Sequence, residues 1–124
     1  MIEYKMSNII VLFWVLVQSV LIVAAQTFLK IAVNMFGAFE LSWRYFRTVL
    51  TTWQLYVSGL LALSTVVLWA YLLKHNDLSF VYPLLSISYI ISLFVGSFIF
   101  GETIPLTRWI GVVIVMIGVY FIIK

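Results

Sequence analysis

Residues 9–29 read IIVLFWVLVQSVLIVAAQTFL, an apolar run that no charged residue interrupts before Lys30. A helix needs roughly 20 apolar residues to cross the hydrocarbon core of a bilayer, and this run is long enough. Backbone N–H and C=O groups in lipid must bond within their own segment, so we expect the run to be helical. It is too long for the apolar core of a signal peptide, and we expect it to remain in the mature structure.

Three further apolar runs follow, at residues 54–73, 80–100 and 106–123. Together with the first run, taken as residues 9–33, they predict four transmembrane helices in one domain that covers residues 1–124. The runs are continuous and do not alternate with a period of two, which argues against the strands of a membrane β-barrel. The sequence therefore predicts an all-α membrane protein, a bundle of four transmembrane helices.

The composition agrees with that fold. The 124 residues are 65% hydrophobic and 9% charged, and their mean hydropathy is +1.21. A soluble domain is about half apolar and a quarter charged. The chain has no cysteine, which excludes disulfides and thiolate chemistry. The net charge of +3 is typical of charges that flank membrane spans, and we expect no nucleic-acid partner.

The loop at residues 34–52 has an amphipathic pattern. Its apolar face would hold Phe39, Trp43, Phe46 and Leu50, and its charged face Glu40, Arg44 and Arg47. This spacing predicts a short helix that lies flat at the membrane interface. The alternative is an aromatic-belt loop that only anchors the bundle.

Polar side chains inside the first run form a stripe. Gln18, Gln26 and Lys30 are separated by steps of eight and four, and we expect them on one helical face. Polar groups at membrane depth usually face the interior of a bundle or a cavity. For Lys30 two interpretations stay open, a side chain that snorkels to the headgroups or a ligand for an anion such as phosphate.

The third run carries two more stripes. Tyr82, Ser86 and Tyr89 lie along one side and are candidates to line a cavity, although interfacial tyrosines would give the same pattern. Ser88, Ser92 and Gly96 repeat every four residues, which favours close helix packing. Pro83 lies near the start of this run, where a missing N–H is least costly.

Signals for an enzyme are absent from the sequence. It has no glycine-rich phosphate loop, no metal-binding cluster and no GxSxG elbow, so we expect neither catalysis nor a cofactor or metal. No carboxylate lies at mid-membrane depth, where a proton-coupled carrier would need one. Glu102 and Arg108 flank the last link, and we expect them to form a structural pair or cap.

Flanking charges do not set a membrane orientation. Lys5, Lys74 and Lys124 fall on one side, and Lys30, Arg44, Arg47 and Arg108 on the other. A bias in lysine and arginine sets topology, and here the two sides are nearly balanced.

Three stretches together resemble the drug/metabolite transporter superfamily, with its EamA and small multidrug resistance branches. They are AAQTFLK at residues 24–30, YPLLS at residues 82–86 and GETIPLTRWIGV at residues 101–112. Within that superfamily the chain is most similar to the four-helix members that flip aminoarabinose-phosphoundecaprenol. The resemblance implies a multi-pass transporter of the bacterial inner membrane that works as a homodimer or as a heterodimer with a similar subunit.

Two details refine the resemblance. Small multidrug resistance proteins carry a glutamate eight residues before a lysine of the first helix, and counting back from Lys30 gives Ile22. Proton-coupled drug efflux is therefore doubtful. In the fourth run, Gly111 and Gly118 lie on one face, and the resemblance implies that they mediate dimerisation; by themselves they are packing glycines.

The predicted function is a flippase for a polyprenyl-phosphate-linked sugar among the membrane lipids. The sugar hydroxyls would be bound by Gln18, Gln26, Tyr82, Ser86 and Tyr89, and the phosphate by Lys30, Arg44 and Arg47. Two alternatives stay open: a non-transporting membrane subunit of a glycosyltransferase complex, and a small multidrug or cation efflux protein.

Overall fold

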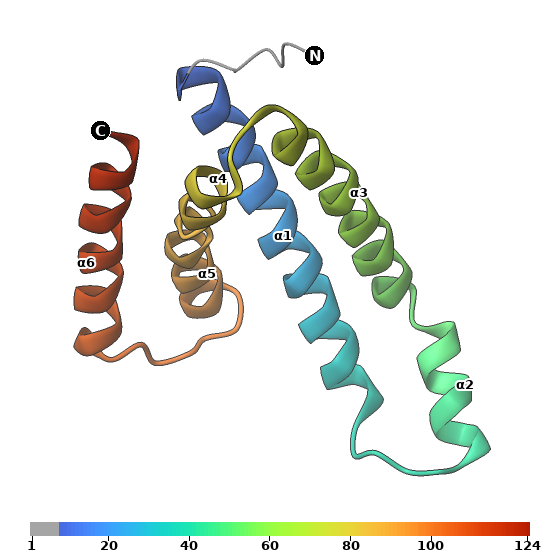
Figure 1. Cartoon of the computed structure of the whole chain (residues 1–124). Helices are drawn as coiled ribbons and strands as arrows, with labels where there is room; N and C mark the ends of the chain where they lie inside the picture. The colour runs from blue at the N-terminus through green and yellow to red at the C-terminus, as the bar shows by residue number, and fades with distance from the viewer. Residues whose placement is uncertain (1–7) are drawn as a thin grey trace.

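A computed structural model describes residues 8–124 of the chain, so Lys5 lies outside the described residues. Within this range the protein consists of helices joined by short links, without a strand (Figure 1). Four segments are long and apolar enough to cross a membrane: α1 (Asn8–Phe36), α3 (Trp53–His75), the pair α4 (Leu78–Leu84) and α5 (Ile87–Phe98), and α6 (Leu106–Ile123). The prediction of an all-α bundle with four spans is confirmed.

The loop after α1 contains a helix, α2 (Trp43–Thr51). Ser42 caps it, because its hydroxyl oxygen accepts a hydrogen bond from the backbone N–H of Tyr45 at 3.3 Å. The helix has no buried residue, so its apolar side chains lie on the surface of this chain. The predicted short helix is therefore present, but it begins at Trp43, so Phe39 and Glu40 precede it.

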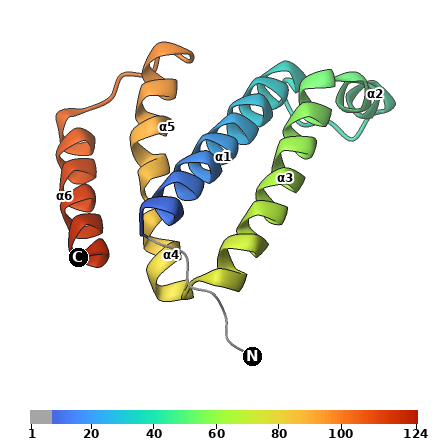
Figure 2. The same cartoon turned by 90° about the horizontal axis from the view of Figure 1, so that it is seen from above.

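Helix α1 is the centre of the arrangement. It packs most extensively against α3 and next against α5, while α6 lies beyond α5 (Figure 2). Two hydrogen bonds join α1 to α3: Gln18 Nε2 donates to the carbonyl of Thr65 at 3.0 Å, and Ser58 Oγ donates to the carbonyl of Ala25 at 2.8 Å. Such bonds between helices in a membrane contribute about 0.6 kcal/mol each.

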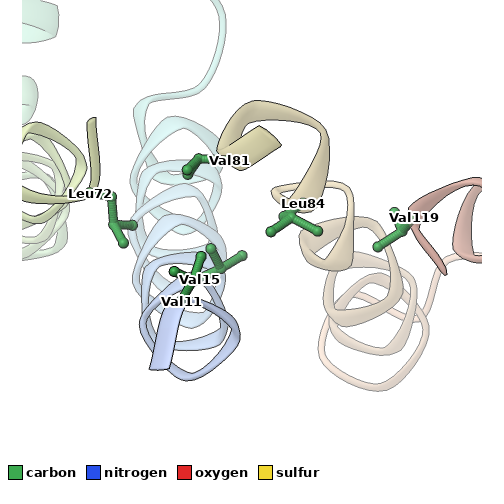
Figure 3. Packing of buried hydrophobic residues seen from close by; sticks show 6 residues of the cluster. All are labelled: Val11, Val15, Leu72, Val81, Leu84 and Val119. Atoms are coloured by element: carbon green, nitrogen blue, oxygen red, sulfur yellow. The ribbon is translucent and has the colours of Figure 1, made fainter. Parts of the chain in front are cut away.

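A buried apolar cluster closes one end of the bundle (Figure 3). It unites α1, α3, α4 and α6 through Val11, Val15, Leu72, Val81, Leu84 and Val119. These residues lie where α1 begins and where α3 and α6 finish. From this end the backbones of α1 and α5 diverge (Figures 1 and 2).

The third span is broken into two helices, which corrects the expectation that Pro83 lies near its start, where a missing N–H is least costly. Pro83 is inside α4 and not in its first turn, so the ring removes a helical hydrogen bond. After Leu84 the chain passes through tight i→i+3 bonds, from Leu85 N–H to the Tyr82 carbonyl at 3.1 Å and from Ser86 N–H to the Pro83 carbonyl at 3.0 Å. Side chains before and after the break therefore do not keep one continuous helical face.

Candidate functional site

A cleft of about 470 Å³ lies between α1 and α5 and extends from the middle of α1 toward the end of the bundle away from the buried cluster. Its walls come from one face of α1, one face of α5 and the link that leads into α6. They are formed by Ile22, Val23, Gln26, Thr27, Lys30, Ser88, Tyr89, Ser92, Leu93, Val95, Gly96, Phe100, Glu102, Ile104 and Arg108. Most of the wall is apolar. Its charged residues are Lys30, Glu102 and Arg108, and the part of the cleft that they line is called its mouth.

The mouth of the cleft is organised around Lys30. Its ammonium forms an ion pair with the carboxylate of Glu102 and lies 4.6 Å from the centre of the Phe100 ring. The two charged side chains are about half exposed, at 46% and 40%. Arg108 lines the same cleft. The mouth thus carries two cations and one carboxylate, and its formal charge favours an anion.

Glu102 packs directly against Gly96. The backbone N–H of Glu102 donates to the Gly96 carbonyl at 2.9 Å. A Cβ added at Gly96 would come within 2.7 Å of Glu102 Oε2, so the carboxylate rests directly on this glycine. Gly101 has a φ of +64°, a conformation that favours glycine and that turns the chain back over α5.

This contact corrects two sequence-based expectations. Glu102 was expected to pair with Arg108 or to cap the last helix, but its carboxylate pairs with Lys30. Ser88, Ser92 and Gly96 were expected to let two helices pack closely, but they line the cleft, and it is the Glu102 side chain that covers Gly96. Lys30 and Glu102 are 72 positions apart in the chain, so no local pattern pointed to their contact.

Hydroxyl groups continue the polar surface inside the cleft. Thr27, Ser88 and Ser92 each donate to a backbone carbonyl of their own segment, at 2.6 to 2.8 Å. Their oxygens keep free lone pairs, which can accept hydrogen bonds from a ligand. Gln26 and Tyr89 are exposed residues of the same wall. The arrangement can therefore bind an anionic group at its mouth and hydroxyl or amine groups deeper inside.

Of the residues predicted for the site, the structure brings Gln26, Lys30 and Tyr89 together in this cleft. Gln18 is not among its lining residues: it is only 2% exposed and its amide bonds to α3. The reason is geometric, because eight residues at about 100° each rotate the face by about 80°. The stripe that leads into the cleft instead continues through Ile22 and Val23.

Tyr82 and Ser86 also lie outside the cleft. Tyr82 belongs to α4, is exposed, and packs its ring edge-on against Trp69 of α3, with centroids 5.9 Å apart. Ser86 is in the break between α4 and α5. The break at Pro83 separates both residues from Tyr89, which is on α5.

Arg44 and Arg47 are exposed residues of α2, which lies beside the start of α3 and away from α5 (Figure 2). Neither lines the cleft. The arginine that does so, Arg108, comes from the first turn of α6. Its position could have been inferred only from the way the link after Gly101 folds back.

The model of the EamA-like transporter family matches residues 1–124. A relative from Pseudomonas fluorescens (strain Pf0-1) is 30% identical over 108 residues, which are 86% of this chain and 91% of that protein. No solved structure matches the chain.

Two further relatives match over shorter segments. A protein of Proteus mirabilis (strain HI4320) is 39% identical over 51 residues, 41% of this chain and 45% of that protein. One from Pectobacterium atrosepticum is 32% identical over 68 residues, 55% of this chain and 59% of that protein. In these two matches the chain spans about half the length of the relative. All three relatives are named probable 4-amino-4-deoxy-L-arabinose-phosphoundecaprenol flippase subunit ArnE.

Proposed function

Because this chain belongs to the EamA-like transporter family, we propose that it moves a polyprenyl-phosphate-linked sugar across the bacterial cytoplasmic membrane. The protein is a multi-pass membrane transporter with four spans. The names of its relatives, which refer to a sugar on phosphoundecaprenol, support this class of substrate. They also favour a transporter over a scaffold for a glycosyltransferase.

The physical task is to carry a small polar headgroup through hydrocarbon. The polyprenyl tail is already stable in lipid, and only the phosphate and the sugar need a polar path, because charges at membrane depth are costly. The cleft between α1 and α5 supports such a path. Lys30 and Arg108 would bind the phosphate, since charge-assisted hydrogen bonds to phosphate are strong.

The sugar would lie deeper in the cleft than the phosphate. Gln26 offers both a donor and an acceptor, Tyr89 a phenol, and Ser92 an oxygen with free lone pairs. Gln18, Tyr82 and Ser86 lie outside the cleft and would not contact the sugar. Gln18 would hold α1 against α3 and thereby keep the cleft wall in place. The mouth of the cleft with its two cations is the single observation that carries the proposal.

We propose further that the working unit is a dimer, formed with a second copy or with a similar four-helix subunit. Only 6% of the membrane-spanning residues of helix α6 are buried in this chain. At Gly111 and Gly118 an added Cβ would meet no atom within 4 Å in the described part of the chain. An open face with two small residues suits close approach of another helix, and the word "subunit" in the relatives' names agrees.

The proposal is tested by flipping in liposomes. Purified protein is reconstituted with a fluorescent polyprenyl-phosphate-linked sugar, and its transfer is followed by chemical quenching of the outer leaflet. Lys30→Ala is expected to lower the rate at least tenfold, because the phosphate loses its cation at the mouth. Lys74→Ala is the matched control, since Lys74 is exposed at the other end of the bundle. Equal rates for Lys30→Ala and the unchanged protein would refute the phosphate site.

A further inference from the structure

We propose that Glu102 is an internal counter-ion that occupies the phosphate site and is displaced when the lipid phosphate binds. This inference rests on the proposed function, because it assumes that Lys30 receives the phosphate. A site that only binds an anion would not need the Glu102 carboxylate, so this carboxylate requires a role of its own. An acidic group beside the cation weakens binding of a phosphate unless it moves aside.

Glu102 is held in a way that suits a replaceable partner. Its main chain is fixed by the hydrogen bond to the Gly96 carbonyl, while its carboxylate reaches Lys30 across the small surface of that glycine. The carboxylate is the far end of a side chain that is 40% exposed. It can therefore rotate away from Lys30 without disturbing the backbone of the link.

The ion pair is weaker than the contact that would replace it. Pairs between half-exposed side chains contribute little to stability, since water screens both charges. A phosphate brings several acceptor oxygens and can bind Lys30 and Arg108 together. The Glu102 carboxylate, which lies against Gly96, pairs with Lys30. Substrate binding would thus release Glu102, and Lys30 would exchange one anionic partner for another.

Return of Glu102 would then help the phosphate to leave. A site along a transport path has to bind its cargo well enough to admit it and weakly enough to release it. Lys30 and Arg108 without a competing carboxylate would retain the phosphate. Removal of Glu102 is therefore expected to tighten binding and, at the same time, to slow net flipping.

The experiment measures binding of farnesyl phosphate and of uncharged farnesol to the full chain in phosphatidylcholine nanodiscs. Glu102→Gln removes the carboxylate charge and keeps the shape of the side chain. It is expected to tighten farnesyl phosphate binding roughly fivefold, the equivalent of one exposed ion pair, and to leave farnesol binding unchanged. In the flipping assay the same variant is expected to be slower than the unchanged protein.

A second variant moves Glu102 without changing any charge. In Gly96→Ala the new Cβ would lie 2.7 Å from Oε2, so the carboxylate has to leave its seat while the helix stays intact. Farnesyl phosphate is expected to bind more tightly, as with Glu102→Gln. Gly59→Ala is the matched control: this glycine is also inside a helix, and an added Cβ would meet nothing within 4 Å among residues 8–124.

The outcomes separate this inference from the proposed function. If farnesyl phosphate binds through Lys30 but Glu102→Gln leaves its affinity unchanged or lowers it, the counter-ion role is overturned and the phosphate site stands. If farnesyl phosphate binds the unchanged protein and Lys30→Ala no better than farnesol does, both the phosphate site and the counter-ion are wrong.

Discussion

The two ends of the bundle differ in what their side chains contact: one end is a buried apolar cluster, and the other carries a cleft with charged residues. At one end, Val11, Leu72 and Leu84 are fully buried and join α1, α3 and α4. At the other end, α1 and α5 line a cleft whose mouth carries the Lys30–Glu102 ion pair. The apolar cluster offers no partner to a charged ligand, whereas an ion pair can exchange one partner for another ion. We therefore expect the packed end to act as a fixed support and the cleft end to receive a charged ligand.

The largest expected effect is at the packed end. Leu84→Ala would leave a cavity among α1, α4 and α6, and large-to-small changes of this kind cost about 2–5 kcal/mol. The free energy of unfolding can be measured in mixed micelles by circular dichroism. Leu63→Ala is the control, because Leu63 is 65% exposed on the surface of α3 and should change stability by less than about 0.5 kcal/mol. Equal losses for both variants would show that the cluster is not a support.

A smaller effect separates the two candidate arginine sites. Arg108→Ala is expected to lower the flipping rate about fivefold, since it removes one of two cations at the mouth of the cleft. Arg44→Ala is expected to change the rate less than twofold, because α2 holds Arg44 outside the cleft. Should Arg44→Ala prove the more damaging change in the liposome assay, the phosphate would have to enter beside α2.

The smallest expected effect concerns the seam between α1 and α3. Ser58→Ala removes the hydrogen bond from Ser58 Oγ to the Ala25 carbonyl and is expected to lower the free energy of unfolding by about 0.6 kcal/mol. Ser64→Ala is the control, since the Ser64 hydroxyl donates to the Leu60 carbonyl of its own helix. A loss of several kcal/mol at Ser58 would mean that this polar seam, and not the apolar cluster, supports the bundle.

The four spans could be predicted from the sequence because membrane thickness sets the length of an apolar run. The helix in the first loop could be predicted as well, since Trp43, Phe46 and Leu50 follow one helical face. These features are local: each depends on neighbours within a few turns.

The composition of the cleft was harder to predict because it depends on contacts between distant segments. Gln26 and Lys30 were placed correctly on one face, but a step of eight residues turns Gln18 toward α3. Glu102 joins Lys30 through the tertiary fold of the α5–α6 link, which sequence spacing does not encode. The break at Pro83 likewise moved Tyr82 away from Tyr89, an effect that a single continuous helix would not have produced.

Ligand protection of single cysteines would test most directly whether the phosphate enters the cleft. The chain has no cysteine of its own, so Ser92→Cys in the cleft and Ser64→Cys on the far face of the bundle can be labelled one at a time with N-ethylmaleimide. Farnesyl phosphate is expected to slow labelling of Ser92→Cys severalfold and to leave Ser64→Cys unchanged, and the added change Lys30→Ala should abolish the protection. Labelling of Ser92→Cys at the same rate with and without farnesyl phosphate would contradict a phosphate site between α1 and α5.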